Sequence, residues 1–135
     1  MYQNQTEGRK TALVVDDTTV MRRGVAYLLS KSGYDVFAVP DGKCALQYLA
    51  TQVPPTIVVT DLRMQYVNGD RVAQSASELA GVAAVVMMTS SELASVPAGV
   101  GAVLPKSEIQ FERPEQTRRK LEETIAEAER HRNAA

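Results

Sequence analysis

Short apolar runs alternate along this chain with longer segments in which apolar residues recur every three or four positions. The pattern predicts strands at about 11–16, 35–39, 56–60, 83–88 and 102–104. It predicts helices at about 18–33, from 42 up to the prolines at 54–55, at about 70–80 and at about 114–131. The first helix is expected to turn one apolar face inward, formed by Val20, Met21, Val25, Leu28 and Leu29. Strands that alternate with helices predict an α/β fold, with a doubly wound parallel sheet and right-handed crossovers.

Acidic residues follow two of the predicted strands. Asp16 and Asp17 come after the first apolar run, and Asp61 comes after the run at 57–60. The carboxyl ends of neighbouring parallel strands meet at one edge of an open α/β sheet, so these three carboxylates are expected to converge in one crevice. Carboxylates at that spacing repel each other unless a hard cation lies between them, and Mg²⁺ is the usual cation.

Composition and charge exclude several classes of protein. The net charge is −1, which gives no electrostatic reason for binding nucleic acid or an anionic membrane. One cysteine, Cys44, permits no internal disulfide and fits a reducing compartment. No signal peptide and no membrane-spanning run are apparent, so the expected location is cytoplasmic. We expect one domain at 10–131, with a disordered lead-in at 1–9 and a frayed tail at 132–135.

Five residues at strand ends stand in the order that characterises a known family. They are Asp16, Asp17, Asp61, Thr89 and Lys106, and the segment 61–69 adds a methionine and a glycine at the family's offsets. On these positions the chain, over about residues 10–130, resembles the CheY-like receiver domain of two-component response regulators, here as a stand-alone domain. The resemblance implies a flavodoxin-like, five-stranded sheet in the order 2-1-3-4-5.

The resemblance also implies a phosphoacceptor site. Asp61 would take a phosphoryl group from a histidine kinase, a phosphotransfer protein or a small phosphodonor. Mg²⁺ would be held by Asp17 directly, by Asp16 through water or in support, by Asp61, and by the backbone carbonyl of Arg63.

Two further residues would complete this chemistry. Lys106 would offset the charge on the phosphoryl oxygens, and Thr89 would donate its hydroxyl to one of them and, by moving, switch the surface of the domain. The domain would catalyse its own phosphorylation and dephosphorylation without being a turnover enzyme. It would pass its signal, or the phosphoryl group, to another protein, with no role for nucleic acid or membrane.

The chain departs from the family pattern after the fourth strand. Ser107 follows Lys106 where the family has a proline joined by a cis bond, so a trans bond and a rearranged loop are predicted. Val103 stands where the family has its switch aromatic, and the segment from Ser90 to Ala98 has room for one or two helical turns only. A shortened or irregular fourth helix is therefore expected, together with a non-standard output surface.

Two other functions stay open. One is a pseudo-receiver, a binding module of the same fold that performs no phosphoryl chemistry. The other is a phosphatase of the haloacid dehalogenase type, which needs a second aspartate two residues after its nucleophile. Thr18 stands at that offset from Asp16, and Arg63 stands at that offset from Asp61, so neither candidate nucleophile has the second aspartate.

Overall fold

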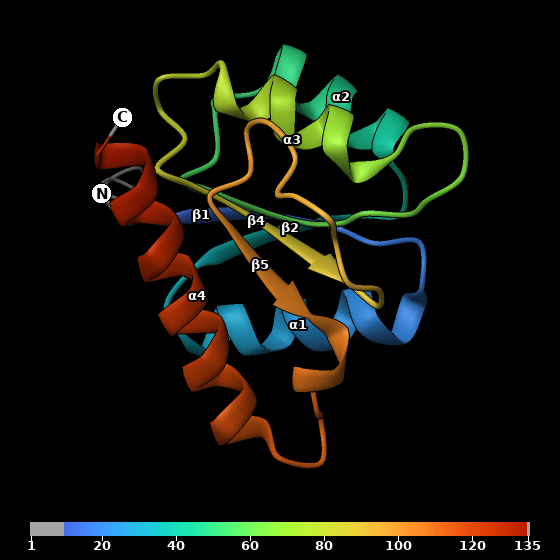
Figure 1. Cartoon of the computed structure of the whole chain (residues 1–135), viewed down its shortest axis with the longest axis vertical. Coiled ribbons are helices and arrows are strands. Elements are labelled where there is room, and N and C mark those ends of the chain that lie inside the picture. Colours follow the sequence, from blue (N-terminus) through green and yellow to red (C-terminus); the bar gives the residue numbers. More distant parts are fainter. Residues whose placement is uncertain (1–9, 135) are drawn as a thin grey trace, which may run out of the picture.

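Five parallel strands and four α-helices make up the part of the chain that the computed structural model describes, residues 10–134 (Figure 1). The expected lead-in at residues 1–9 lies outside the described residues. The strands are β1 (Thr11–Val15), β2 (Asp35–Val39), β3 (Ile57–Asp61), β4 (Ala84–Thr89) and β5 (Ala102–Pro105). The helices are α1 (Thr19–Lys31), α2 (Gly42–Thr51), α3 (Gly69–Ser77), the short 3-10 helix η2 (Lys106–Glu108) and α4 (Pro114–Ala134).

The sheet has the order β2-β1-β3-β4-β5, which confirms the predicted fold class. Helices α1 and α4 lie on one face of the sheet, and α2 and α3 lie on the other (Figure 1). Alternate residues of each strand point to opposite faces, so Val14 and Val59 pack with the first helix pair while Leu13 and Val58 pack with the second. Both faces are apolar, because each is covered by helices.

Helix α1 faces the sheet with a narrower stripe than the sequence predicts. Val25, Leu28 and Leu29 are buried, whereas Val20 is 71% exposed, so the prediction of an inward Val20 is wrong. Val20 lies five residues before Val25, which places it roughly 140° around the helix from that core position. The first turn of α1 therefore presents Val20 to solvent.

The connection between β4 and β5 is irregular, as predicted. Residues 90–101 contain bends and turns but no helix, so the label α4 belongs to the last helix of the chain. The three other strand-to-strand connections each contain a helix. Val103 of β5 is consequently only partly buried on the face that carries α2 and α3.

The segment after β5 differs from the family pattern in the predicted sense. The residues described here contain no cis peptide bond, so the Lys106–Ser107 bond is trans. Lys106 opens η2, and Phe111 in the turn that follows packs on Gly24 of α1, where any side chain would collide with the ring. The rearranged loop is thereby anchored to the neighbouring helix.

The last helix continues beyond the predicted end. It runs through Ala134, and the Arg132 Nη2 donates a hydrogen bond of 2.8 Å to the backbone oxygen of Leu79, just after α3. The helix thus reaches into the segment that the sequence predicted as a frayed tail, while the domain limits themselves stay a prediction. Within residues 10–134, no helix is both long and apolar enough to cross a membrane.

Candidate active site

Three carboxylates meet at the carboxyl edge of the sheet. Asp16 directly follows β1, Asp17 comes next, and Asp61 is the last residue of β3, which pairs with β1 in the register Val15 to Thr60. One oxygen from each carboxylate lies within 4.8 Å of the others. Asp16 and Asp61 are buried and Asp17 is exposed, so the cluster opens to solvent on the Asp17 side. The structure brings these residues together as the sequence predicts.

Lys106 lies between the two buried carboxylates. Its Nζ is 3.2 Å from the Asp16 Oδ2 and 3.1 Å from the Asp61 Oδ2. The side chain enters from the end of β5, two strands away from β3, and only a long side chain spans that distance. The altered loop after β5 thus still delivers the ammonium group to the carboxylates.

The titration of this group of charges reflects burial and mutual contact. Burial raises the pKa of the Asp61 carboxyl, the nearby Asp16 charge raises it further, and the hydrogen bond from Lys106 opposes the rise. Burial alone lowers the pKa of Lys106, but its contacts with Asp61 and Asp16 raise that pKa above the ordinary lysine value. The ammonium is therefore held in its charged form, whereas ionisation of Asp61 is made harder.

The acidic cluster fits a hard divalent cation. The Asp16 Oδ1 accepts a hydrogen bond of 2.8 Å from the backbone N–H of Thr18, whereas its buried Oδ2 makes no well-oriented hydrogen bond. That oxygen has the Lys106 ammonium at 3.2 Å as its charge partner, and carboxylate oxygens are the kind of ligand that Mg²⁺ takes in proteins. With the Asp17 and Asp61 carboxylates, the donor set suits Mg²⁺.

Backbone contacts fix the two acidic loops. Arg22 lies in the first turn of α1, and its Nη1 donates a hydrogen bond of 2.9 Å to the backbone carbonyl of Asp16. The Thr60 hydroxyl donates a hydrogen bond of 2.9 Å to the Asp61 backbone carbonyl. Gly69 lies so close to this carbonyl oxygen that a Cβ atom at position 69 would collide with it. Sequence reasoning missed Arg22 and Thr60. The available signal was a guanidinium one turn into the helix that follows the acidic pair, and a hydroxyl on the residue directly before Asp61.

Thr89 and Arg63 lie at the site without joining the carboxylate cluster. Thr89 ends β4 and is buried. Its Oγ1 donates a hydrogen bond of 3.0 Å to the Ser91 carbonyl and accepts one of 3.1 Å from the Ser91 N–H. The hydroxyl is thus engaged with its own loop. Arg63 lies exposed, two residues after Asp61.

This arrangement can be compared with known proteins. The sequence profile described as the response regulator receiver domain matches residues 12–106 of the chain. The chain belongs to this family. Its fold is that of a receiver domain in two-component signalling.

Relatives of this receiver domain include regulators of two-component systems. The two-component response regulator ORR7 of Oryza sativa subsp. japonica is 32% identical over 102 residues, which make up 73% of this chain and 47% of that protein. The alkaline phosphatase synthesis transcriptional regulatory protein PhoP of Bacillus subtilis (strain 168) is 30% identical over 83 residues, 62% of this chain and 34% of that protein. The receiver domain therefore spans less than half the length of these relatives.

Solved structures share the fold. The response regulator receiver protein from Sinorhizobium medicae WSM419 has a TM-score of 0.74 at 24% identity, covering 93% of this chain and 98% of that one. The CheY-like receiver domain protein from Methanospirillum hungatei JF-1 has a TM-score of 0.73 at 22% identity, covering 91% and 98%. At these identities the likeness extends to the fold alone.

Proposed function

We propose that this receiver domain accepts a phosphoryl group on Asp61 in a Mg²⁺-dependent step and signals through contact with another protein. The observation that carries the proposal is the buried pair Asp16 and Asp61 with the Lys106 ammonium between them, 3.2 and 3.1 Å away. In this constellation an Asp61 oxygen lies beside a positive charge at the edge of the sheet, where it would act as the nucleophile. Phosphoryl transfer needs positioning and charge stabilisation more than covalent assistance from the protein.

The residues would divide the step between them. The carboxylate oxygen of Asp61 forms a bond to phosphorus while the bond from phosphorus to the donor's leaving atom breaks, and the leaving group takes that electron pair. Lys106 faces the negative charge on the transferring oxygens. Asp17, Asp16, Asp61 and the backbone carbonyl of Arg63 would hold the Mg²⁺. Bound there, the cation supplies neutralisation of phosphoryl charge.

Thr89 would connect this chemistry to the surface. Its hydroxyl is bonded to Ser91 in the present structure. A phosphoryl group on Asp61 offers charged oxygens, which make stronger hydrogen bonds than a backbone carbonyl does. If the Thr89 hydroxyl moved its hydrogen bond from the Ser91 carbonyl to such an oxygen, Ser91 would be released and the loop after β4 would change. We propose that the donor is a histidine kinase or phosphotransfer protein in the cytoplasm, and that the domain also hydrolyses its own aspartyl phosphate.

Mass spectrometry of the intact protein tests the proposal. After incubation with acetyl phosphate and Mg²⁺, the wild type should gain the mass of one phosphoryl group. The Asp61→Asn variant should gain none, and chelation of Mg²⁺ should abolish the gain in the wild type. If the wild type gains nothing while Mg²⁺ binding is also absent, the domain is a pseudo-receiver that acts by binding alone. The altered sequence around Lys106, with Ser107 in place of the family's proline, is the feature that favours this second function.

A further inference from the structure

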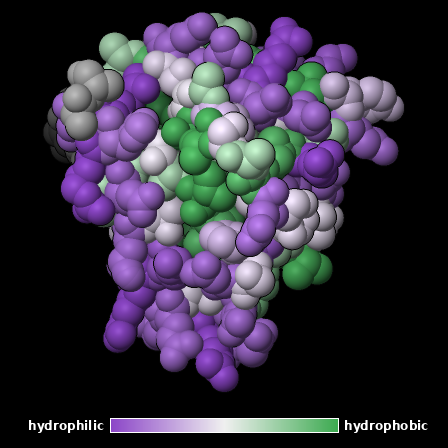
Figure 2. Space-filling view, in the orientation of Figure 1, coloured by the Kyte–Doolittle hydropathy of each residue, from purple (hydrophilic) through white to green (hydrophobic). Residues whose placement is uncertain are grey.

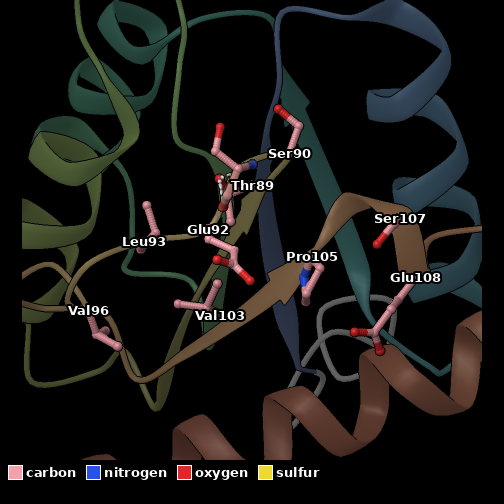
Figure 3. A pocket seen from close by; sticks show the side chains of 10 residues that line it. Thr89, Ser90, Glu92, Leu93, Val96, Val103, Pro105, Ser107 and Glu108 are labelled. Carbon is pink, nitrogen blue, oxygen red and sulfur yellow. Dashed lines mark hydrogen bonds between the residues drawn. The ribbon is translucent and has the colours of Figure 1, made fainter.

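A groove of about 790 Å³ lies beside the irregular connection between β4 and β5. Figure 2 shows an apolar patch in the middle of this face, surrounded by hydrophilic surface. In Figure 3 the side chains of Glu92 and Val103 lie between the segment 89–96 and β5, with Val96 toward one end and Glu108 toward the other. Val96 is 57% exposed, so its methyl groups are available to a partner.

The groove has a structural cause. In this sheet α1, α2 and α3 lie in the connections from β1 to β2, β2 to β3 and β3 to β4, but residues 90–101 form no helix between β4 and β5. The face of β5 next to α3 therefore has no helix of its own over it, and Leu93 and Val103 are only partly buried. A parallel sheet normally has both faces covered, commonly by the crossover helices themselves. The uncovered strip is partly apolar and lies in the one connection of this sheet, among the described residues, that has no helix.

The charges of the groove restrict what kind of helix fits. Its lining contains two carboxylates, Glu92 and Glu108, and no lysine or arginine. Glu108 is paired with Lys120 of α4 at 3.1 Å, whereas no ion pair of Glu92 occurs among residues 10–134. A basic side chain on an incoming segment would therefore find an unneutralised carboxylate beside an apolar floor. An acidic segment would meet repulsion.

We propose that this groove is a docking site for a basic amphipathic helix of a partner protein. Apolar side chains at positions i, i+3 or i+4, and i+7 would occupy the floor formed by Leu93, Val96 and Val103, and a lysine or arginine beside them would pair with Glu92. The proposal depends on the groove of the unmodified protein and not on phosphoryl transfer. Its failure and the failure of the proposed phosphoacceptor function are therefore separate results.

Two synthetic helical peptides test the proposal. Both carry the same leucine stripe over about 15 residues, a length near the limit for helix formation, and are cross-linked to hold the helix. One carries lysines and the other glutamates on the polar face. Fluorescence anisotropy of the labelled peptides with the full chain should show saturable binding of the lysine peptide. The affinity of the glutamate peptide should be lower by roughly tenfold or more, because its negative charges would face Glu92.

Paired substitutions locate the binding. Val96→Asn should weaken binding of the lysine peptide roughly tenfold through loss of apolar contact, whereas Val53→Asn, at another exposed valine outside the groove, should leave it unchanged. Glu92→Gln should weaken binding roughly threefold, and Glu78→Gln, at an exposed glutamate outside the groove, should not. The two variants within each pair have the same net charge. Any difference between them therefore does not come from the general attraction of a basic peptide to the protein.

Three results would overturn the proposal. The first is that neither peptide binds, and the second is that both bind equally well. The third is that the lysine peptide binds Val96→Asn as well as it binds Val53→Asn, which would place its binding site outside the groove. Sedimentation analysis of the wild type covers the remaining occupant of the groove. Self-association that Val96→Asn abolishes and Val53→Asn preserves would assign the groove to a second copy of this chain, and the partner helix would be wrong.

Discussion

The two sides of the carboxyl edge of this sheet are built differently. On the β1–β3 side, buried carboxylates are fixed by backbone hydrogen bonds and by a glycine that fits directly against the Asp61 carbonyl. On the β4–β5 side, the connecting chain has no helix, and a groove lies where the fold elsewhere places one. The side that would perform the chemistry is tightly constrained, and the side next to Thr89 is open. The chemistry and the partner groove are thus built mainly by different segments, and Thr89 at the end of β4 is where the two meet.

The largest effect is expected where the constrained side leaves no space. Gly69→Ala would place a methyl group against the Asp61 backbone oxygen, so it should lower the free energy of unfolding by about 3 kcal/mol. At Gly81 the nearest atom to an added Cβ is Cβ of the exposed Pro54 ring at 3.3 Å, so Gly81→Ala should change stability by less than about 1 kcal/mol. Urea unfolding of the two variants measures the difference. Equal stabilities would show that the acceptor loop can relax.

Lys106→Met tests the charges of the same side. It leaves the buried Asp16 and Asp61 carboxylates facing each other without the ammonium, and because the Lys106 side chain is itself partly exposed, a loss of about 1–3 kcal/mol is expected. Lys120→Met breaks the exposed pair with Glu108 and should cost less than about 1 kcal/mol.

The pH dependence of this effect has a definite sign. The pKa of Lys106 is raised by folding, so its contribution is present below the unfolded lysine value and is lost as the pH rises through the folded value. The pKa of Asp61 is also raised, so protonation of Asp61 on acidification removes one partner of Lys106 and shrinks the difference between wild type and Lys106→Met. Thermal unfolding at several pH values checks this. A difference that grows on acidification would contradict it.

Arg22→Ala is expected to have a smaller effect. It removes the 2.9 Å hydrogen bond to the Asp16 carbonyl and should cost about 1 kcal/mol of stability. Arg22 holds the acidic loop in position without being a ligand, so the affinity for Mn²⁺, used in calorimetry as a stand-in for the proposed Mg²⁺, should also fall a few-fold. The neighbouring Arg23 is exposed, and Arg23→Ala should change neither quantity. If both variants bind Mn²⁺ as the wild type does, the loop is fixed without Arg22.

The sequence predicted the fold well because strand and helix signals are local. Buried runs, prolines and caps placed the five strands and the four α-helices in order, although β3 and β4 each lie one residue later than predicted and α2 and α3 end sooner. The short helical turns expected between β4 and β5 do not form, and η2 was not predicted. The convergence of Asp16, Asp17 and Asp61 was also predictable, since strand ends share one edge of the sheet.

The missed features depend on contacts between distant segments. Val20 has the apolar side chain of a core residue, but its position around the axis of α1 exposes it to solvent. Lys106 was expected at the site through the family resemblance, but its bridge to two carboxylates was not. That bridge and the bond from Arg132 to Leu79 join segments whose closeness in space no local pattern encodes. The groove could be anticipated only as a short connection, because its lining depends on how residues 90–101 fold back against β5.

One measurement tests most directly the claim that the chemical side works independently of the open side. Wild type, Asp61→Asn and Val96→Asn are incubated side by side with acetyl phosphate and Mg²⁺, and their intact masses are followed over time. The account predicts that wild type and Val96→Asn gain one phosphoryl group at similar rates and that Asp61→Asn gains none. A phosphoryl group acquired by Asp61→Asn, or none acquired by the wild type, would contradict the assignment of Asp61. Loss of the gain in Val96→Asn would contradict the separation of the two sides.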